Sequence, residues 1–436
     1  MSLPKVLIFG QSFNNKYGGG ITLSNLFRGW HIDRIAVAAT GHMMYNLSTE
    51  ICDTYYQLGY EESRWRFPFN LIQKKFPSGL QSFDNKSSNS VKKNKASLRH
   101  KLVNQVLFPA LEWLGLIHSL SKIKMSIGFK KWLNEYKPEI LYLQVSTRED
   151  VLFATNLKEY LRIPSAIHMM DDWPTTISQK GLFRKYWANR IDHEFRKLLE
   201  RTDLFLSISD AMSEEYQKRY GKRFIPFHNP VCVSKYKQKE NNSLKDVGLF
   251  KILYIGRIGV ANKNSIYDFA IAISHFRTGT TRIIFDIYTS DTNSLDAKRL
   301  SKLESVKVHS AINHEEVPGL LKEYDLLLLP LDFTKHGLEY ARYSIPTKAS
   351  EYMASGTPIL VYAPKETAIS QFCFENECGC CVTEHNPVQL KNAILLLIND
   401  EVYRRKLSLN AVRLASKLFD ADKVRKEFQS LLNNLL

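Results

Sequence analysis

The stretch that decides the fold is Tyr324–Tyr362, YDLLLLPLDFTKHGLEYARYSIPTKASEYMASGTPILVY. Its apolar run Leu326–Leu329 predicts a strand that is buried on both faces. A loop follows, and Pro346 predicts the first turn of a helix, because the missing proline N–H costs nothing there. We expect this helix to end before Gly356 and a second strand to cover 358–362. A strand, a helix and a strand in this order form one unit of a parallel sheet.

The start of this helix is the first candidate binding site. Ser344 lies just upstream as a candidate N-cap, and Lys348 and Glu351 lie about one turn apart, so both can face one ligand. Open α/β sheets bind phosphorylated ligands at helix N-termini beyond the carboxyl ends of strands, where free N–H groups attract anions. An ordinary unit with a solvated charged face is the alternative, and this stretch alone is compatible with both.

The composition is that of a globular protein with a strong excess of positive charge. The chain has 436 residues, of which 44% are hydrophobic, so we expect two domains with packed cores. The net charge of +16 favours an anionic partner, whether a nucleotide, a nucleic acid or an acidic lipid surface. Four of the six cysteines lack the paired spacing of zinc ribbons, which favours reduced structural thiols over a metal site: Cys373, Cys378, Cys380 and Cys381.

The N-terminus and the longest apolar stretch both argue against membrane insertion. Met1–Pro4 leads directly into KVLIFG, which predicts a first strand rather than a signal peptide. The stretch Leu102–Leu120 contains too many polar residues to span a bilayer. We therefore expect a cytoplasmic protein, either free or peripheral on the cytosolic face of a membrane.

The segment 81–101 differs in composition from the rest of the chain. It is rich in Ser, Asn and Lys and predicts a basic, mobile insertion. The following region, 102–136, combines lysines with Trp113 and Trp132, which is typical of a helix resting on an anionic membrane surface. The same composition is also typical of helices that cover a sheet and keep their lysines in solvent, so both interpretations stay open.

Apolar strands and helical segments alternate along most of the chain. The first strand, Lys5–Phe9, is followed by a glycine-rich loop at Gly18–Gly20 and a helix from Ile21. The pattern breaks at 223–231, RFIPFHNPV, which resembles a linker, and starts again with the strand at 251–256. This alternation predicts parallel sheets with right-handed crossovers. We expect an α/β protein of two doubly wound, Rossmann-like domains that face each other across a ligand-binding cleft.

The break at the linker also sets the expected domain boundaries. The first domain covers 1–232, the second covers 233–418, and a terminal helix covers 419–436. Further strands are predicted at 34–39, 140–144, 164–168, 203–207, 282–288 and 306–309, and further helices at 149–160, 182–201, 210–220, 265–275, 314–324, 387–399 and 401–418.

A second candidate site follows the first strand of the second domain. Arg257 comes directly after this strand, and Lys263 stands at the start of the next helix. Two cations beside a helix N-terminus suit a diphosphate, since arginine can bind two oxygens at once and lysine adds a point charge. Glu351 in the first candidate site suits a sugar diol, because its two oxygens accept hydrogen bonds in parallel. Each cation alone is also compatible with an ordinary surface role.

A third candidate site is HMMDDW at the end of a first-domain strand. His168 is followed by Asp171, Asp172 and Trp173 on an expected loop, a combination that suits contact with a polar substrate. A histidine at a strand end is also often structural. The two aspartates resemble a metal-binding pair, but the cations above already neutralise an anionic ligand, so we expect no metal here.

Taken together, these features resemble the GT-B glycosyltransferases and, within them, the GT4-like retaining family (glycosyl transferases group 1). The resemblance covers nearly the whole chain and is strongest from Lys251 to Tyr362. It rests on the glycines Gly18–Gly20, IHMMDDW at 167–173, HNPV at 228–231, YIGR and NK at 254–263, and above all PTKASEYMASGTPILVY at 346–362.

The resemblance implies a role for each candidate site. The second domain would bind a nucleotide sugar, with its diphosphate held by Arg257 and Lys263 and its ribose by Glu351. His168 would contact the donor sugar near the reacting carbon, and the glycine loop Gly18–Gly20 would approach the diphosphate and the acceptor from the first domain. Asp171, Asp172 and Trp173 would lie on the acceptor side, and the terminal helix would pack back on the first domain.

The sequence departs from the family pattern at one position. The family usually has two glutamates eight residues apart, and Glu351 fits the second, but the first falls at Tyr343. Glu339 lies four residues too early to replace it. We therefore expect Arg342, Tyr343 or Ser344, together with Lys348, to contact the donor.

The function implied by the resemblance is retaining, metal-free transfer of a sugar from a nucleotide sugar to a glycan, a lipid-linked or another hydroxyl acceptor. No cofactor is implied beyond this donor, and the partners expected are the donor, the acceptor and an anionic membrane surface. Two alternatives stay open: a nucleotide-sugar epimerase or phosphorylase on the same fold, and a nucleic-acid-binding protein. A phosphorylase should carry a lysine-bound cofactor site, and a nucleic-acid-binding protein should carry a recognised module; we identify neither in this sequence.

Overall fold

The computed structural model describes residues 3–14, 18–41, 43–45, 47–81, 107–178, 180–236, 248–274 and 281–436. The basic insertion predicted at 81–101 lies outside these ranges except for its first residue. The chain divides into two compact units. The first comprises Met1–Ser207, Ser213–Ile225 and Phe428–Leu436, and the second comprises Ile208–Met212 and Pro226–Glu427.

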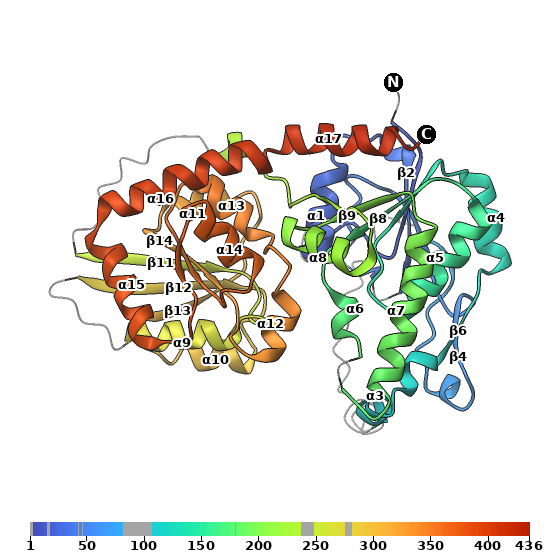
Figure 1. Ribbon diagram of the computed structural model, residues 1–436, viewed down its shortest axis with the longest axis horizontal. Helices are drawn as coiled ribbons and strands as arrows, with labels where there is room; N and C mark the ends of the chain where they lie inside the picture. Colours follow the sequence, from blue (N-terminus) through green and yellow to red (C-terminus); the bar gives the residue numbers. More distant parts are fainter. Residues whose placement is uncertain are drawn as a thin grey trace. The chain divides into compact units, whose positions relative to one another are not determined.

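The first unit is built around an eight-stranded sheet with the order β10-β9-β8-β7-β1-β2-β3-β5 (Figure 1). The pairs from β9 to β3 are parallel, and β5 is antiparallel to β3. The bounds are β1 (Val6–Phe9), β2 (Ile35–Thr40), β3 (Thr54–Leu58), β5 (Gly79–Leu80), β7 (Ile140–Leu143), β8 (Ser165–Met169), β9 (Leu204–Ser207) and β10 (Ile225–Pro226). A separate antiparallel pair joins β4 (Ser63–Trp65) to β6 (Ser121–Ile123).

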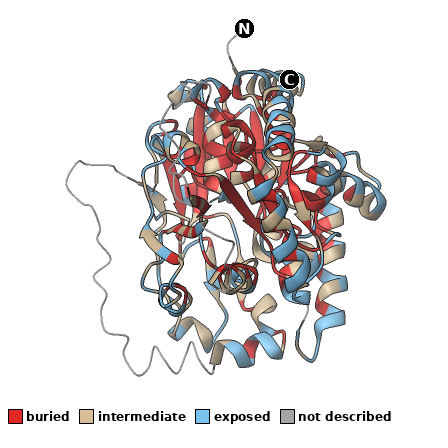
Figure 2. Ribbon diagram, turned by 90° about the vertical axis from the view of Figure 1, so that its left-hand side faces the viewer, coloured by how far each residue is buried: buried red, intermediate tan, exposed pale blue. Residues whose placement is uncertain are grey.

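Helices cover this sheet, as a parallel sheet with buried strands requires. They are α1 (Gly18–Phe27), α3 (Phe108–Trp113), α4 (Ile127–Tyr136), α5 (Arg148–Leu161), α6 (Trp173–Thr176), α7 (Arg184–Glu200) and α8 (Asp210–Tyr220). All four residues of β1 and of β7 are buried, and the central strands stand out as buried in Figure 2. The start of α5 is fixed by a capping box, in which Thr147 and Asp150 each bind the other's backbone N–H.

The second unit contains a six-stranded sheet with the order β13-β12-β11-β14-β15-β16, in which every pair is parallel. This is the 3-2-1-4-5-6 order of a doubly wound, Rossmann-like domain. The bounds are β11 (Leu249–Ile255), β12 (Arg282–Thr289), β13 (Val306–Ser310), β14 (Leu326–Pro330), β15 (Ile359–Tyr362) and β16 (Cys380–Val382).

The helices of the second unit lie on both faces of its sheet (Figure 1). They are α9 (Lys263–Ser274), α10 (Leu295–Leu300), α11 (Val317–Lys322), α12 (Lys335–Ala341), α13 (Lys348–Ser355), α14 (Ala368–Glu375), α15 (Pro387–Asn399) and α16 (Glu401–Leu414), which continues into a π-helical turn at Ala415–Phe419. The last helix, α17 (Ala421–Asn433), contributes its final residues to the first unit, where the Phe428 ring packs on Phe27 and Trp30.

The stretch Tyr324–Tyr362 forms the two predicted strands, but the segment between these strands differs from the prediction. The strand predicted at Leu326–Leu329 is confirmed as β14, and the strand after Gly356 is confirmed as β15. The expected loop contains the short helix α12. The next helix begins at Lys348 instead of Pro346, so the prediction of Ser344 as N-cap was wrong: Thr347 occupies that position without a side-chain cap bond. Gly356 ends the helix with a φ of +74°, as predicted.

The glycine-rich segment was also placed wrongly by the sequence. Gly18, Gly19 and Gly20 form the first turn of α1, where a loop was expected. A Cβ at Gly20 would lie 1.9 Å from Nδ2 of Asn14, so only glycine allows this close approach. The demand of tertiary packing therefore outweighs the low helix propensity of three glycines.

Within the described ranges, no helix combines the length and apolar character needed to cross a bilayer. All six cysteines fall within these ranges as free thiols, and Cys373 and Cys378 are completely buried.

Candidate functional site

The candidate site of the second unit lies where its strand order reverses. β11 is the first strand of this sheet in the sequence, and it pairs with β12 on one side and β14 on the other. In sheets of this order, ligands bind beyond the carboxyl ends of the two strands at the reversal. The segments that leave these ends are 256–262 after β11 and 331–347 after β14.

The loop after β11 is held in shape by its own polar groups. The Tyr254 hydroxyl donates to the carbonyl oxygen of Arg257 at 2.7 Å, and Nδ2 of Asn262 donates to the Tyr254 hydroxyl at 2.7 Å. Gly256 has a φ of +147°, which side chains rarely allow. A Cβ at Gly256 would lie 2.3 Å from Nζ of Lys348. The glycine therefore lets the Lys348 side chain pass directly against the loop.

The two predicted diphosphate-binding cations stand at either end of this loop. Arg257 and Lys263 are both exposed, and Lys263 is the first residue of α9. The first N–H groups of α9 are bound by Asp332, whose carboxylate accepts from the Ser265 backbone at 2.8 Å and from Nδ2 of Asn264 at 2.9 Å. Asp332 is completely buried, and this desolvation raises its pKa. The Asp332 carboxylate thus occupies the first N–H groups of α9, and Arg257 and Lys263 supply the exposed positive charge at this loop.

Lys348 and Glu351 lie in the first turn of α13, and the protein surroundings perturb both charges. Nζ of Lys348 lies 4.0 Å from the centre of the Tyr254 ring. Burial lowers the pKa of Lys348 to about 7 and raises the pKa of Glu351 to about 7. Each charge opposes the shift of the other, so the two residues interact, but desolvation dominates both. Nε2 of His314 lies 3.5 Å from Oε1 of Glu351.

The segment before α13 is tied to neighbouring loops through its backbone. The carbonyl oxygen of Tyr343 accepts a hydrogen bond from the Ser209 hydroxyl, and that of Thr347 accepts from Nδ2 of Asn229 at 3.1 Å. The backbone of the segment before α13 is therefore held in place by these hydrogen bonds. Tyr343, where the family usually has a glutamate, and Ser344 are both half-buried.

His168 lies in the first unit, inside β8. Its Nδ1 lies 2.5 Å from the Tyr142 hydroxyl, and the residue is 1% exposed. The two rings also meet edge to face, with centres 6.1 Å apart. The structure thus places His168 in the core of this unit, near the carboxyl end of its strand.

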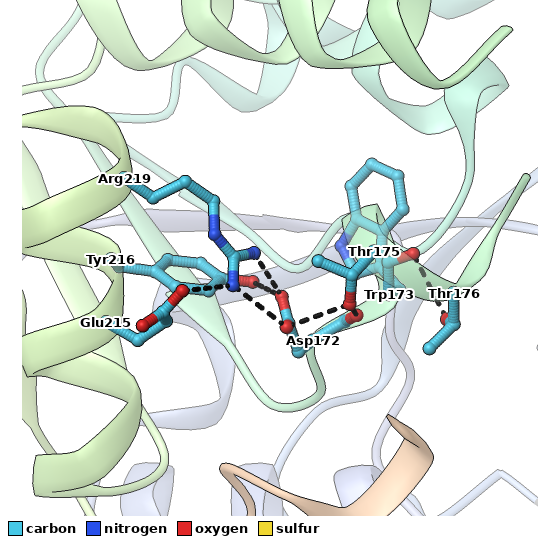
Figure 3. A network of polar contacts seen from close by, with 7 residues as sticks. All are labelled: Asp172, Trp173, Thr175, Thr176, Glu215, Tyr216 and Arg219. Atoms are coloured by element: carbon cyan, nitrogen blue, oxygen red, sulfur yellow. Dashed lines mark hydrogen bonds and ion pairs between the residues drawn. The ribbon is translucent and has the colours of Figure 1, made fainter. Parts of the chain in front are cut away.

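Asp172 is the centre of a polar network (Figure 3). Its carboxylate accepts from Nη1 of Arg219 at 2.8 Å and Nη2 at 3.2 Å, from the Tyr216 hydroxyl at 2.9 Å and from the Thr175 hydroxyl at 2.9 Å. Asp172 is 4% exposed. Both of its oxygens are occupied, which makes Asp172 a structural link between the β8–α6 segment and α8.

The two neighbours of Asp172 have different surroundings. Asp171 is exposed. Trp173 begins α6 and packs edge to face on Phe195, with ring centres 5.5 Å apart. Among the described residues, no three His, Cys, Asp or Glu side chains come together in a group that could hold a metal ion.

The structure also identifies site residues that the sequence did not single out. These are Tyr254 and Asn262 in the loop, Asp332 at the end of β14, and His314 beside Glu351. Asp332 could have been predicted from the sequence, because a carboxylate that follows a buried strand of a parallel sheet lies at the edge of the sheet where ligands bind. The contact of His314 with Glu351 joins residues 37 positions apart, and no local pattern indicates it.

Two comparisons with known sequences each match part of the chain. Residues 250–400 match the family described as "Glycosyl transferases group 1". An uncharacterized glycosyltransferase of Methanocaldococcus jannaschii is 26% identical over a region that covers 46% of this chain and 59% of the relative. The match therefore spans little more than half the length of that curated relative.

Solved structures resemble the chain over almost all of its length. HepE of Anabaena in complex with UDP-glucose is 15% identical with a TM-score of 0.61, covering 99% of this chain and 100% of HepE. Sucrose-phosphate synthase of Thermosynechococcus elongatus is 13% identical with a TM-score of 0.62, covering 99% of this chain and 98% of the synthase. At these identities the likeness shows the fold, with two parallel-sheet, Rossmann-like domains. The matched family and this fold agree with the resemblance seen in the sequence: residues 250–400 match the glycosyl transferases group 1 family, and the chain has a GT-B-like fold.

Proposed function

We propose that the chain transfers a sugar from a nucleotide-sugar donor to a hydroxyl group of a glycan or lipid-linked acceptor, with net retention of configuration. The observation that carries this proposal is the pair Lys348 and Glu351 beside the Gly256 loop, at the binding edge of the second sheet. A half-buried cation and a half-buried carboxylate one turn apart match a diphosphate and a ribose diol on one ligand.

The proposed role of the cations is to hold the diphosphate and to stabilise its charge as it leaves. Arg257 and Lys263 are exposed at the two ends of the loop, and Lys348 lies against Gly256. Positive charge that is in place before the reaction is the largest catalytic contribution such a site can make. These side chains supply the charge neutralisation of the leaving group, so the proposed mechanism routes no step through a metal ion.

The proposed role of Glu351 is to accept hydrogen bonds from the two ribose hydroxyls. Its burial raises its pKa to about 7, so in the ligand-free chain near neutral pH the carboxylate is protonated in a large fraction of molecules. Two hydroxyl donors would favour the charged form and lower this pKa again. Glu351 therefore gains its full charge when the nucleotide binds.

The roles of the remaining predicted residues stay predictions. Tyr343 and Ser344 are placed before α13, where they would contact the donor sugar. His168 is proposed to contact the same sugar, although its ring is buried and bound to Tyr142 in this structure. Gly20 and its neighbours would approach the donor from α1. Substitution of His168 by alanine should lower turnover more than nucleotide affinity if this role is correct.

The first donors to test are uridine diphosphate sugars. The complexes of HepE contain UDP and UDP-glucose. The base and the sugar used by this chain are proposals, since the identity to HepE is 15%.

The experiment that tests the proposal is a thermal-shift screen of the full chain against nucleoside diphosphates and nucleotide sugars, followed by titration of the best ligand. Substitution of Glu351 by alanine should weaken binding about a hundredfold, because two charged hydrogen bonds are lost. The variant should also lose the preference for the ribose over the 2′-deoxyribose form of the ligand. Substitution of Glu339 by alanine on α12 is the matched control. Unchanged affinity of the Glu351 variant would refute the ribose assignment.

We also propose that the first unit contacts an anionic membrane surface from the cytosolic side. Trp113, Leu182 and Phe183 are 57%, 61% and 50% exposed, and the Leu182 N–H donates to the Trp113 carbonyl at 2.7 Å. The exposed cations Arg184 and Lys185 follow directly. Apolar side chains next to cations suit the interface of an anionic bilayer. A variant with Trp113, Leu182 and Phe183 changed to serine should sediment less with phosphatidylglycerol vesicles; equal sedimentation would contradict this contact.

A further inference from the structure

The first unit contains a cavity of about 550 Å³ that none of the proposed donor contacts uses. Its volume is within the range of small-molecule sites. We name it the basic pocket, after the cations among the residues that line it from four segments of the chain: Arg66, Lys122, Arg148, Arg190, Tyr186 and Trp187. All of these residues belong to the first unit, so the pocket does not depend on the placement of the second.

The basic pocket lies at the edge of the sheet where ligands bind. Arg148 is the first residue of α5, the helix that follows the central strand β7, so it stands beyond the carboxyl end of a parallel strand. Lys122 is contributed by the β4–β6 pair, where it stands opposite Arg64. Tyr186 and Arg190 lie near the start of α7. Arg66 follows β4, so four separate segments of the chain meet around one cavity.

The cations of the basic pocket outnumber the carboxylates that neutralise them. Glu194 accepts from Nε of Arg148 at 2.6 Å and from Nε of Arg190 at 2.7 Å. Although burial raises it, these hydrogen bonds hold the pKa of Glu194 below its ordinary value. Glu194 therefore serves two arginines. Glu149 is a second carboxylate that interacts with Arg148, and burial raises its pKa. Arg66 and Lys122 have no carboxylate within 4.0 Å in the part of the chain that the structure describes, so the wall keeps a positive excess.

The aromatic wall of the basic pocket is fixed by packing. The Arg148 guanidinium carbon lies 5.2 Å from the centre of the Trp187 ring, and Trp187 is 9% exposed. A Cβ at Gly115 would lie 2.4 Å from Cδ1 of Trp187, so only glycine leaves room for this ring. Tyr186 packs edge to face on Trp187 at 5.1 Å and is 58% exposed. The wall thus combines one rigid aromatic residue with one that a ligand can reach.

Hydroxyl and amide groups complete the lining of the pocket. Ser119 and Asn156 line it together with the cations and the aromatic residues. Side-chain hydroxyls and amides can both donate and accept, which suits the hydroxyl groups of a sugar. Arginine and lysine suit a phosphate or carboxylate group. An uncharged sugar would use the hydroxyl and amide groups but not the cations, and an inorganic anion would use the cations alone.

We propose that the basic pocket binds an anionic saccharide, a sugar that carries a phosphate or a carboxylate group, as the acceptor or as part of it. This proposal rests on the function proposed above, because it names the acceptor class for the same transfer reaction. The anion would lie between Arg66, Lys122 and the Arg148–Glu194–Arg190 cluster, and the sugar ring would lie against Tyr186.

The test is calorimetric titration of the full chain with glucose 6-phosphate, glucuronate and glucose. We expect one or both anionic sugars to bind at least tenfold more tightly than glucose and to weaken as salt is added. Lys122→Gln and Arg66→Gln should each weaken the anionic sugars about tenfold, since each removes one charged contact. Lys124→Gln is the matched control, because Lys124 is exposed on the same segment and does not line the pocket.

Three outcomes would overturn the proposal: glucose binding as tightly as the anionic sugars, equal effects of Lys122→Gln and Lys124→Gln, or an effect of Lys122→Gln on phosphatidylglycerol vesicles without one on the sugars. The last outcome would assign these cations to a lipid surface. Titration with UDP in parallel separates this proposal from the proposed function. Binding of UDP with no selective binding of anionic sugars would refute only the basic pocket's role, whereas selective sugar binding without nucleotide binding would refute the donor site.

Discussion

Nζ of Lys348 lies 4.0 Å from the centre of the Tyr254 ring, against the loop at Gly256. The aromatic face attracts the ammonium group, but the loss of water around it is the larger effect, and it lowers the pKa of Lys348 to about 7. A lysine with this pKa is half charged near neutral pH. The affinity of the site for an anionic ligand should therefore depend on pH in the physiological range.

Nucleotide affinity should fall as the pH rises from 6 to 9, because Lys348 loses its proton through this range. The ligand to use is UDP-glucose, whose phosphates stay ionised throughout. Lys348→Arg should flatten this dependence, since a guanidinium keeps its charge, and Lys348→Gln should weaken binding about tenfold at pH 6. Lys335→Gln on α12, at a side chain 91% exposed, is the control. Glu351 ionises in the same range and opposes this trend, so the comparison is made in the Glu351→Gln background. Equal affinity of that variant at pH 6 and pH 9 would show that Lys348 does not face the ligand.

The ionisation of Glu351 should destabilise the ligand-free chain as the pH rises. Burial raises its pKa from 4.5 to about 7, so folding favours the protonated form. The stability linked to this group is fully present below pH 4.5 and is lost as the pH rises to about 7. The side chain introduced by Glu351→Gln cannot ionise. The melting temperature of this variant, minus that of the native chain, should therefore increase from pH 5 to pH 8. A constant difference, measured by thermal unfolding alongside Glu339→Gln, would contradict the raised pKa.

Two glycines of one loop should differ in their tolerance of alanine. Gly256 has a φ of +147°, and a Cβ there would lie 2.3 Å from Nζ of Lys348, so Gly256→Ala should displace this side chain and weaken nucleotide binding about tenfold or more. No atom would lie within 4 Å of a Cβ at Gly259, so Gly259→Ala should bind like the native chain. Titration of both variants with UDP checks this. Similar affinities would mean that Lys348 does not depend on the Gly256 backbone.

Two neighbouring aspartates should differ in their contribution to stability. Asp172 is 4% exposed and binds Arg219 and Tyr216. Asp172→Ala should lower the free energy of unfolding by about 2 kcal/mol, because the buried Tyr216 hydroxyl loses its acceptor and Arg219 keeps only Glu215 as a partner. Asp171 is exposed, and Asp171→Ala should change it by less than about 0.5 kcal/mol. Urea unfolding measures both. A kinetic defect of Asp172→Ala without a loss of stability would instead support the predicted contact with the acceptor.

The strand pattern and the order of the elements could be predicted from the sequence. Runs such as Leu326–Leu329 are apolar because strands of a parallel sheet are buried on both faces, and the structure confirms this strand as β14. The prediction failed where local propensity was a poor guide. Gly18–Gly20 begin a helix, α12 occupies an expected loop, and the short strand β16 with its cysteines was not predicted at all.

The sequence by itself determined which kinds of chemical group the site contains: cations after β11, and a lysine and a glutamate one turn apart on α13. It did so because strand ends and helix turns follow from periodicity along the chain. Only the tertiary structure decided that Asp332 binds the start of α9, that Lys348 lies on Tyr254 beside Gly256, and that four cations surround one pocket in the first unit. These contacts join residues far apart in the chain, and the desolvation that shifts the pKa of Lys348 and Glu351 exists only after the sheet and its helices have packed.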